Sequence, residues 1–249
     1  MKSFLNHDKS ILTSMVQGDN PERVIELMDK SMAEGAEAFG MQFCRMKKEF
    51  RNPETYKRLF NYTHLPVYVT NYRHWDNVGL TDDELAKGLI ELAECGATLC
   101  DVMGDYFDKQ PDEMARDEGA IDKQMRLIDT LHEKGAEVLI SSHVLKFTPA
   151  ERVLEIALEH ERRGADISKI VVGADNMEEE IENFRIMNLL KQNLKIPFLF
   201  LSGGECHLLR RVGGELGSCM YLCVHEYDSF ATATQPLLKK VKAIRDNMR

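Results

Sequence analysis

The chain has 249 residues and a formal net charge of −9, with 43% hydrophobic and 29% charged residues, which is ordinary for a soluble globular protein with a sizeable core. The acidic balance argues against a nucleic-acid partner, because a phosphate-binding surface needs a surplus of Lys and Arg. The N-terminus lacks the apolar run of a secretory signal, and no segment approaches the roughly 18 consecutive apolar residues that span a bilayer, so we expect no membrane partner.

Apolar runs rich in β-branched residues alternate along the chain with amphipathic stretches. The apolar runs are typical of short buried strands, and the amphipathic stretches are typical of helices. Predicted strands are 11–16, 38–43, 66–71, 97–102, 137–142, 167–172, 197–202 and 219–224, and predicted helical stretches are 21–35, 81–96, 148–164, 176–193 and 235–248.

Several of these helices carry recognisable boundary residues. Pro21 stands at a predicted helix start, and Thr81 followed by Glu84 forms a capping box. Thr148 is predicted to cap the next such helix, with Pro149 at its first helical position.

Three predicted helices end at a glycine that is followed at once by a strand, at Gly35, Gly135 and Gly164. Such strict alternation of strand and helix predicts a parallel sheet. Eight units in this length favour a closed (β/α)8 barrel, an α/β fold, as a single domain over 1–249. A doubly wound open sheet is disfavoured by the strand count and by the lack of a GxGxxG turn after the first strand.

The cysteines have irregular spacing, which is typical of reduced, partly buried thiols in a cytoplasmic protein. No Cys/His cluster has the spacing of zinc ligands, so we predict no metal and no other cofactor. The six cysteines are Cys44, Cys95, Cys100, Cys206, Cys219 and Cys223.

Polar residues gather at the carboxyl ends of the predicted strands, where a barrel builds its active site. Two of them stand out, Lys169 within the strand 167–172 and His143 just after the preceding strand. Burial disfavours the charged form of a lysine and would lower its pKa, and a neutral amine forms imines with ketones. A neighbouring histidine can then move a proton. The pair therefore predicts Schiff-base chemistry with a general acid/base.

The segment "VLISSHVLKFTP" (138–149), followed by "GADISKIVV" (164–172), resembles the type I 3-dehydroquinate dehydratase family of class I aldolase-like barrels. The resemblance implies that Lys169 forms the imine with the substrate ketone and that His143 is the general acid/base. It also implies a homodimer that acts on a small keto acid.

Two further segments carry the same resemblance. "LSGGECHLLRRVGGELGS" (201–218) begins with Ser202 and puts Arg211 at the family's carboxylate-binding arginine, with Arg210 beside it as the solvated residue. "ATATQPLL" (231–238) puts Gln235 at the carboxylate-binding glutamine, and Thr232 stands next to the place of the family's serine.

Other positions depart from the family pattern. The family's Glu-x-Arg on the second strand is replaced by Gly40 and Gln42, and Arg73 comes one residue later than the third-strand arginine. Asp76 falls on the acid that assists the histidine, and Asp101 at the end of the fourth strand is a second candidate for orienting His143.

The predicted activity is a metal-free hydro-lyase that dehydrates 3-dehydroquinate, or a related cyclic β-hydroxy keto acid, to the enone. Its catalytic residues are Lys169, His143, Asp76 and Asp101, and its substrate-binding residues are Arg211, Gln235, Gln42, Arg73, Ser202 and Thr232. Three alternatives stay open: a class I retro-aldolase or isomerase of a keto acid, a non-catalytic barrel that binds a small carboxylate, and a metal-dependent sugar epimerase.

Overall fold

Eight parallel strands form the inner wall of the molecule in a computed structural model that describes residues 2–5 and 7–248. Their order is β7-β6-β5-β4-β3-β2-β1-β8, so consecutive strands from β1 to β7 pair with one another and β1 also pairs with β8. Between β7 and β8, Cys219 N donates to Phe198 O at 2.8 Å. The predicted (β/α)8 barrel is confirmed. The strands are β1 (Ile11–Met15), β2 (Ala38–Gln42), β3 (Val67–Thr70), β4 (Leu99–Met103), β5 (Glu137–His143), β6 (Ile167–Gly173), β7 (Phe198–Gly203) and β8 (Met220–Cys223).

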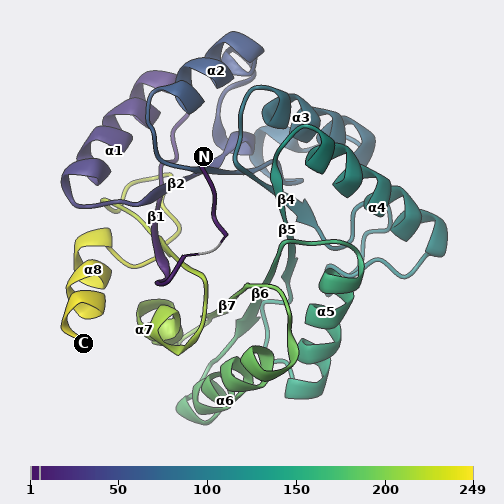
Figure 1. Ribbon diagram of the computed structural model, residues 1–249, viewed down its shortest axis with the longest axis vertical. Coiled ribbons are helices and arrows are strands. Elements are labelled where there is room, and N and C mark those ends of the chain that lie inside the picture. Colours follow the sequence, from purple (N-terminus) through teal and green to yellow (C-terminus); the bar gives the residue numbers. More distant parts are fainter. Residues whose placement is uncertain (1, 6, 249) are drawn as a thin grey trace.

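Helices surround the strands as an outer ring (Figure 1). They are α1 (Pro21–Ala33), α2 (Pro53–Asn61), α3 (Asp82–Glu94), α4 (Glu118–Glu133), α5 (Ala150–Arg162), α6 (Met177–Asn193), α7 (Leu209–Leu216) and α8 (Leu238–Asn247). Short 3-10 turns lie at Phe43–Arg45, Lys48–Phe50 and Trp75–Asn77. Within 2–5 and 7–248, no helix is both long enough and apolar enough to cross a membrane.

The five predicted helical stretches correspond to α1, α3, α5, α6 and α8, with ends that differ by up to three residues, whereas α2, α4 and α7 lie outside the predicted stretches. The Thr81 side chain and Glu84 form the capping box of α3. Gly35 and Gly135 adopt positive φ of 90° and 82°, as left-handed residues after a helix do. The predicted Thr148 cap is wrong, because α5 begins only at Ala150 and the Thr148 hydroxyl instead donates to Lys146 O at 3.1 Å.

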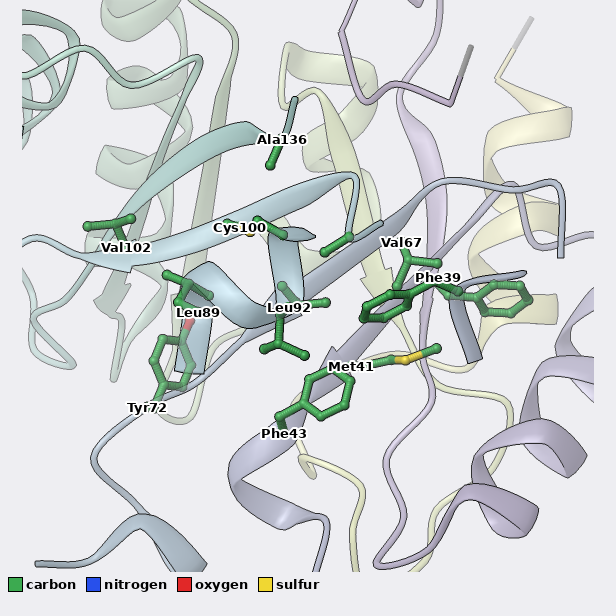
Figure 2. Close-up of a cluster of buried hydrophobic side chains, with 14 of the residues drawn as sticks. Phe39, Met41, Phe43, Val67, Tyr72, Leu89, Leu92, Cys100, Val102 and Ala136 are labelled. Atoms are coloured by element: carbon green, nitrogen blue, oxygen red, sulfur yellow. The ribbon is translucent and has the colours of Figure 1, made fainter. Parts of the chain in front are cut away.

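The apolar core has two layers, because successive side chains of a strand point to opposite faces. The outer layer lies between strands and helices. Figure 2 shows part of it, where Phe39 and Met41 of β2 and Cys100 of β4 lie near Leu89 and Leu92 of α3.

The inner layer fills the barrel below the strand ends. It includes Phe4, which is 2% exposed and whose backbone N–H donates to Glu137 Oε2 at 2.7 Å. The N-terminal segment therefore covers the amino-terminal end of the barrel (Figure 1), and the interior is accessible from the carboxyl ends.

His160 ties α5 to the two strands that carry His143 and Lys169. Its ring is fully buried, with Nδ1 3.0 Å from Ser168 Oγ on β6 and Nε2 3.1 Å from Ser142 Oγ on β5. Burial, helped by the nearby Arg163 charge, lowers the pKa of His160 to about 3. The imidazole is therefore neutral in the folded protein over the whole physiological range.

This burial predicts a specific loss of stability in acid. Between about pH 6.5 and pH 3 the unfolded chain binds a proton at His160 and the folded chain does not, so the free energy of unfolding falls as the pH falls. His160→Gln removes this contribution. Urea unfolding between about pH 6.5 and pH 4.5 should give a shallower decline for the variant, by up to about 1.4 kcal/mol per pH unit. Parallel profiles of the two proteins would contradict the assignment.

Candidate active site

Lys169 lies at the floor of a cavity of about 430 Å³ that opens at the carboxyl ends of the strands. It sits near the middle of β6, and the whole residue is 4% exposed. Its Nζ atom is 2.8 Å from the Tyr72 hydroxyl, 3.0 Å from the Tyr68 hydroxyl and 3.1 Å from Asp101 Oδ2. The structure thus gives the amine a carboxylate partner, rather than the isolated apolar setting that the sequence suggested.

Asp101 is a buried carboxylate that accepts hydrogen bonds from three hydroxyl groups. The hydroxyls of Tyr68 and Tyr72 donate to Oδ2, and Ser141 Oγ donates to Oδ1 at 2.5 Å. Burial acts to raise the pKa of Asp101, but Lys169 and these hydrogen bonds outweigh it and lower the pKa. The carboxylate is therefore ionised. Asp101 is the counter-ion of Lys169, which corrects the expectation that it orients His143.

The two phenols around Lys169 are neutral donors. Burial raises the pKa of both Tyr68 and Tyr72, and the Asp101 charge raises it further. Each phenol donates its proton to Asp101 and offers an oxygen lone pair to Lys169. Neither phenol is among the site residues predicted from the sequence.

His143 ends β5 and is held by Glu113. One carboxylate oxygen, Oε2, lies 2.7 Å from His143 Nδ1 and accepts the His143 backbone N–H at 2.8 Å. Burial acts to raise the pKa of Glu113, but the bonds to His143 lower it overall. An ionised Glu113 accepts the proton of Nδ1, so Nε2 carries the free lone pair. Its lone pair makes His143 a competent base.

Glu113 belongs to the loop between β4 and α4, which sequence reasoning did not connect to the site. Its φ is 48°, an uncommon conformation for a residue other than glycine. The buried guanidinium of Arg163 holds both ends of this loop, donating to Gly104 O at 2.9 Å and to Ala115 O at 2.8 Å. The loop is thereby fixed so that Glu113 reaches His143.

Asp76 does not have the role that the sequence analysis expected. Its side chain is 48% exposed and lies 3.9 Å from Arg51 Nη2, in the turn Trp75–Asn77. Glu113 forms the contact to His143 in its place.

Of the two consecutive arginines, Arg210 lines the cavity and Arg211 is not among the described lining residues. Arg210 is 8% exposed, and its Nε donates to Ser202 O. Burial lowers the pKa of Arg210 to about 10, so it stays charged at neutral pH. Arg211 Nη1 donates to His207 O at 3.0 Å. The expectation that Arg210 is solvated is wrong, since α7 turns Leu209, Arg210 and Gly213 inward.

Three other predicted residues line the cavity: Gln42, Thr232 and Gln235. Gln42 Oε1 accepts from Arg45 Nε at 3.1 Å. Gln235 is 5% exposed, and within the described part of the chain its Oε1 has no hydrogen-bond partner. The Gln235 carboxamide oxygen is therefore a buried acceptor without a partner.

Arg73 and Ser202 lie outside the described cavity lining, which corrects their predicted role in substrate binding. Arg73 is occupied by two carboxylates, Asp82 at 2.7 Å and Asp105 at 2.6 Å. Ser202 is fully buried, and its hydroxyl donates to Glu180 Oε1 at 3.1 Å. Both residues support the loops around the cavity. No group of three or more His, Cys, Asp or Glu side chains in residues 2–5 and 7–248 is arranged to hold a metal ion.

Among curated relatives, a 3-dehydroquinate dehydratase of Alkaliphilus oremlandii is 35% identical over 92 residues, 36% of each chain. One from Lactiplantibacillus plantarum is 27% identical over 139 residues, 55% of this chain and 53% of that one. The chain thus spans about a third to a half of the length of these relatives.

Solved structures agree on the fold over the whole chain. A 3-dehydroquinate dehydratase of Geobacillus kaustophilus has a TM-score of 0.82 at 17% identity, covering 100% of this chain and 97% of that one. A type I enzyme of Clostridium difficile has a TM-score of 0.78 at 16% identity, covering 99% and 96%. The family model for type I 3-dehydroquinase matches residues 15–246. On this match, the chain belongs to the type I 3-dehydroquinase family.

Proposed function

We propose that this protein is a Schiff-base hydro-lyase that dehydrates 3-dehydroquinate or a related cyclic β-hydroxy keto acid. The observation that carries the proposal is the position of His143 relative to Lys169. In the pairing of β5 with β6, Ser141 is the partner of Lys169 and His143 lies two residues further along. Side chains two apart share a face of a strand. His143 therefore stands on the cavity side of Lys169, next to a ketone bound at Nζ.

Asp101 supports imine chemistry through its fixed negative charge beneath Nζ. The ammonium of free Lys169 and the iminium formed from it carry the same positive charge at the same atom. A buried carboxylate at 3.1 Å stabilises both. The protonated imine, which is the form that withdraws electrons, is thus favoured over the neutral imine.

The proposed dehydration begins with formation of the imine at Lys169. His143 Nε2 first takes one proton from the Lys169 ammonium, and the neutral amine then attacks the ketone carbon. His143 returns that proton to the hydroxyl of the carbinolamine, which leaves as water and gives the protonated imine. His143 Nε2 then takes a proton from the carbon next to the iminium. The β-hydroxyl leaves as water after His143 returns that proton. Hydrolysis of the imine consumes one water and releases the enone, so the net change is loss of one water.

Arg210 and Gln235 are the residues that we assign to the substrate carboxylate. Arg210 brings a permanent charge with planar donors, which suits a carboxylate. Gln235 lines the same cavity and can donate through its Nε2 amide group, and Thr232 lies in the same segment. By holding the carboxylate, Arg210 and Gln235 fix the substrate ring relative to Lys169.

The proposal includes a cytoplasmic location and a homodimer. The free state of all six cysteines supports a reducing compartment. The homodimer rests on the family resemblance.

Borohydride trapping tests the imine. Incubation of the protein with 3-dehydroquinate and borohydride should add the reduced substrate to Lys169, located by peptide mass mapping. Lys169→Ala should lose both the adduct and the enone absorbance. Turnover that persists in Lys169→Ala, or an adduct on another lysine, would sink the proposal.

Glu113 and Asp76 offer a matched test of which acid supports His143. Glu113→Gln should lower kcat about 100-fold with little change in KM, because a neutral amide cannot stabilise the imidazolium and can impose the wrong tautomer. Asp76→Asn should leave kcat within about twofold, since its side chain is half exposed and Glu113 forms the contact to His143 Nδ1. The reverse order of effects in steady-state kinetics would refute the assignment.

The neighbouring arginines provide a second matched pair. Arg210→Ala should lower kcat/KM at least about tenfold, because it removes a charged hydrogen bond to the carboxylate. Arg211→Ala should stay within about twofold, because its guanidinium lies outside the described cavity lining. A larger effect at Arg211 would restore the role that the sequence suggested.

A further inference from the structure

Apolar side chains line the cavity from several directions. Its wall is formed by Met15 of β1, Met103 of β4, Val171 of β6, Leu201 of β7 and Leu222 of β8. At the mouth, the wall continues through the exposed side chains of Trp75 and Leu145. A ligand above Lys169 is thus surrounded mainly by carbon and sulfur atoms.

Most charged or titratable groups of the cavity are already engaged or assigned. His74, which also lines the cavity, packs edge-on against Trp75, with 5.7 Å between the ring centroids. Lys169 is bound to Asp101 and the two phenols, and His143 is bound to Glu113. Arg210, together with Gln235, is assigned to the substrate carboxylate.

Few neutral polar side chains of the cavity can pair with a ring hydroxyl. Gln42 Oε1 already accepts from Arg45 Nε, which leaves the amide nitrogen of Gln42 as a donor. Thr232 and Thr234 lie in the same segment as Gln235, at the carboxylate end. In the described residues, Thr70 Oγ1 is left as a buried hydroxyl without a partner.

Met15 occupies the space where a polar side chain would enter from β2. A Cβ atom at Gly40 would overlap Met15 Sδ and lie 3.1 Å from a ring carbon of Tyr68. No side chain fits at position 40 while Met15 keeps its place. A ring hydroxyl directed toward β1 and β8 would therefore meet the thioether of Met15 and the isobutyl group of Leu222.

Such a wall selects against a polyol. A hydroxyl that leaves water and finds no partner loses hydrogen bonds without replacement, whereas a methylene in the same position gains contact. An apolar pocket changes the preference between related ligands by about tenfold or more per group. The wall therefore binds a ring with few hydroxyl groups better than a ring with many.

We infer that the Lys169 cavity takes a cyclic keto acid with one β-hydroxyl, the leaving group, on an otherwise unhydroxylated ring. This inference rests on the proposed function for the position of the ketone and for the reaction. The chemistry is unchanged: one α-proton and the β-hydroxyl depart as water and leave the enone. Hydroxyl groups elsewhere on the ring take no part in these steps.

The test compares two substrates that share ketone, carboxylate and leaving hydroxyl. One is 3-dehydroquinate, and the other is 1-hydroxy-3-oxocyclohexane-1-carboxylate, which lacks the two remaining ring hydroxyls. With the full chain, kcat/KM from enone absorbance should be at least about tenfold higher for the deoxygenated compound. A smaller ratio, or a preference for 3-dehydroquinate, overturns the inference.

Borohydride trapping in the same samples distinguishes a failure of this inference from a failure of the proposed function. If an adduct forms on Lys169 but the ratio of kcat/KM between the two substrates is below tenfold, the inference is wrong and the proposed hydro-lyase activity is retained. Absence of an adduct with either ketone removes the hydro-lyase, and the inference falls with it.

A pair of variants at Met15 tests the cause of the preference. Met15→Gln adds an amide of similar size and should narrow the ratio about tenfold, while Met15→Leu keeps the wall apolar and should keep the ratio near its original value. Equal ratios in the two variants contradict a role for wall polarity. Thermal unfolding checks that each variant is folded. If a variant is not folded, the comparison of the two substrates in the unsubstituted protein decides the inference.

Discussion

The buried ion pair between Lys169 and Asp101 is the constraint on which the rest of the site depends. Two charges held out of water are costly unless their remaining bonding capacity is filled. Tyr68, Tyr72 and Ser141 fill it, and together with the pair they come from β3, β4, β5, β6 and the residues that follow β3. The reactive amine is therefore positioned by the register of four neighbouring strands, β3 to β6.

The loops above this network are strained, and packing holds them in place. Trp75, Glu113 and Leu145 have positive φ of 51°, 48° and 57°, and all three line the cavity. Strain of this kind persists where neighbours over-determine the conformation. Arg163 does this for the loop of Glu113, and Arg45 lies 3.8 Å over the Trp75 ring. Strand register thus positions the residues at the floor of the site, and Arg163 and Arg45 hold Glu113 and Trp75 at its rim.

This division explains which residues the sequence could predict. The eight strands, Lys169 and His143 were found because a buried parallel strand is a local apolar run, and a polar residue in or just after it stands out. Glu113 has no such local signal in the sequence, because its contact with His143 depends on a loop path that Arg163, at the end of α5, holds in place. The choice between Arg210 and Arg211 depended on the rotation of α7, where one residue turns a side chain by about 100°.

Tyr68 links the chemistry of the site to its selectivity. Its hydroxyl contacts Lys169 and Asp101, while a carbon of its ring would lie 3.1 Å from a Cβ at Gly40. A polar side chain at position 40 would therefore displace Met15 and press on the ring that supports the ion pair. Because the Tyr68 side chain both supports the ion pair and packs beside Gly40, a polar group that recognises further ring hydroxyls cannot be added at position 40 alone. Such a change requires Met15, Gly40 and Tyr68 to move together while the phenol stays within reach of Lys169.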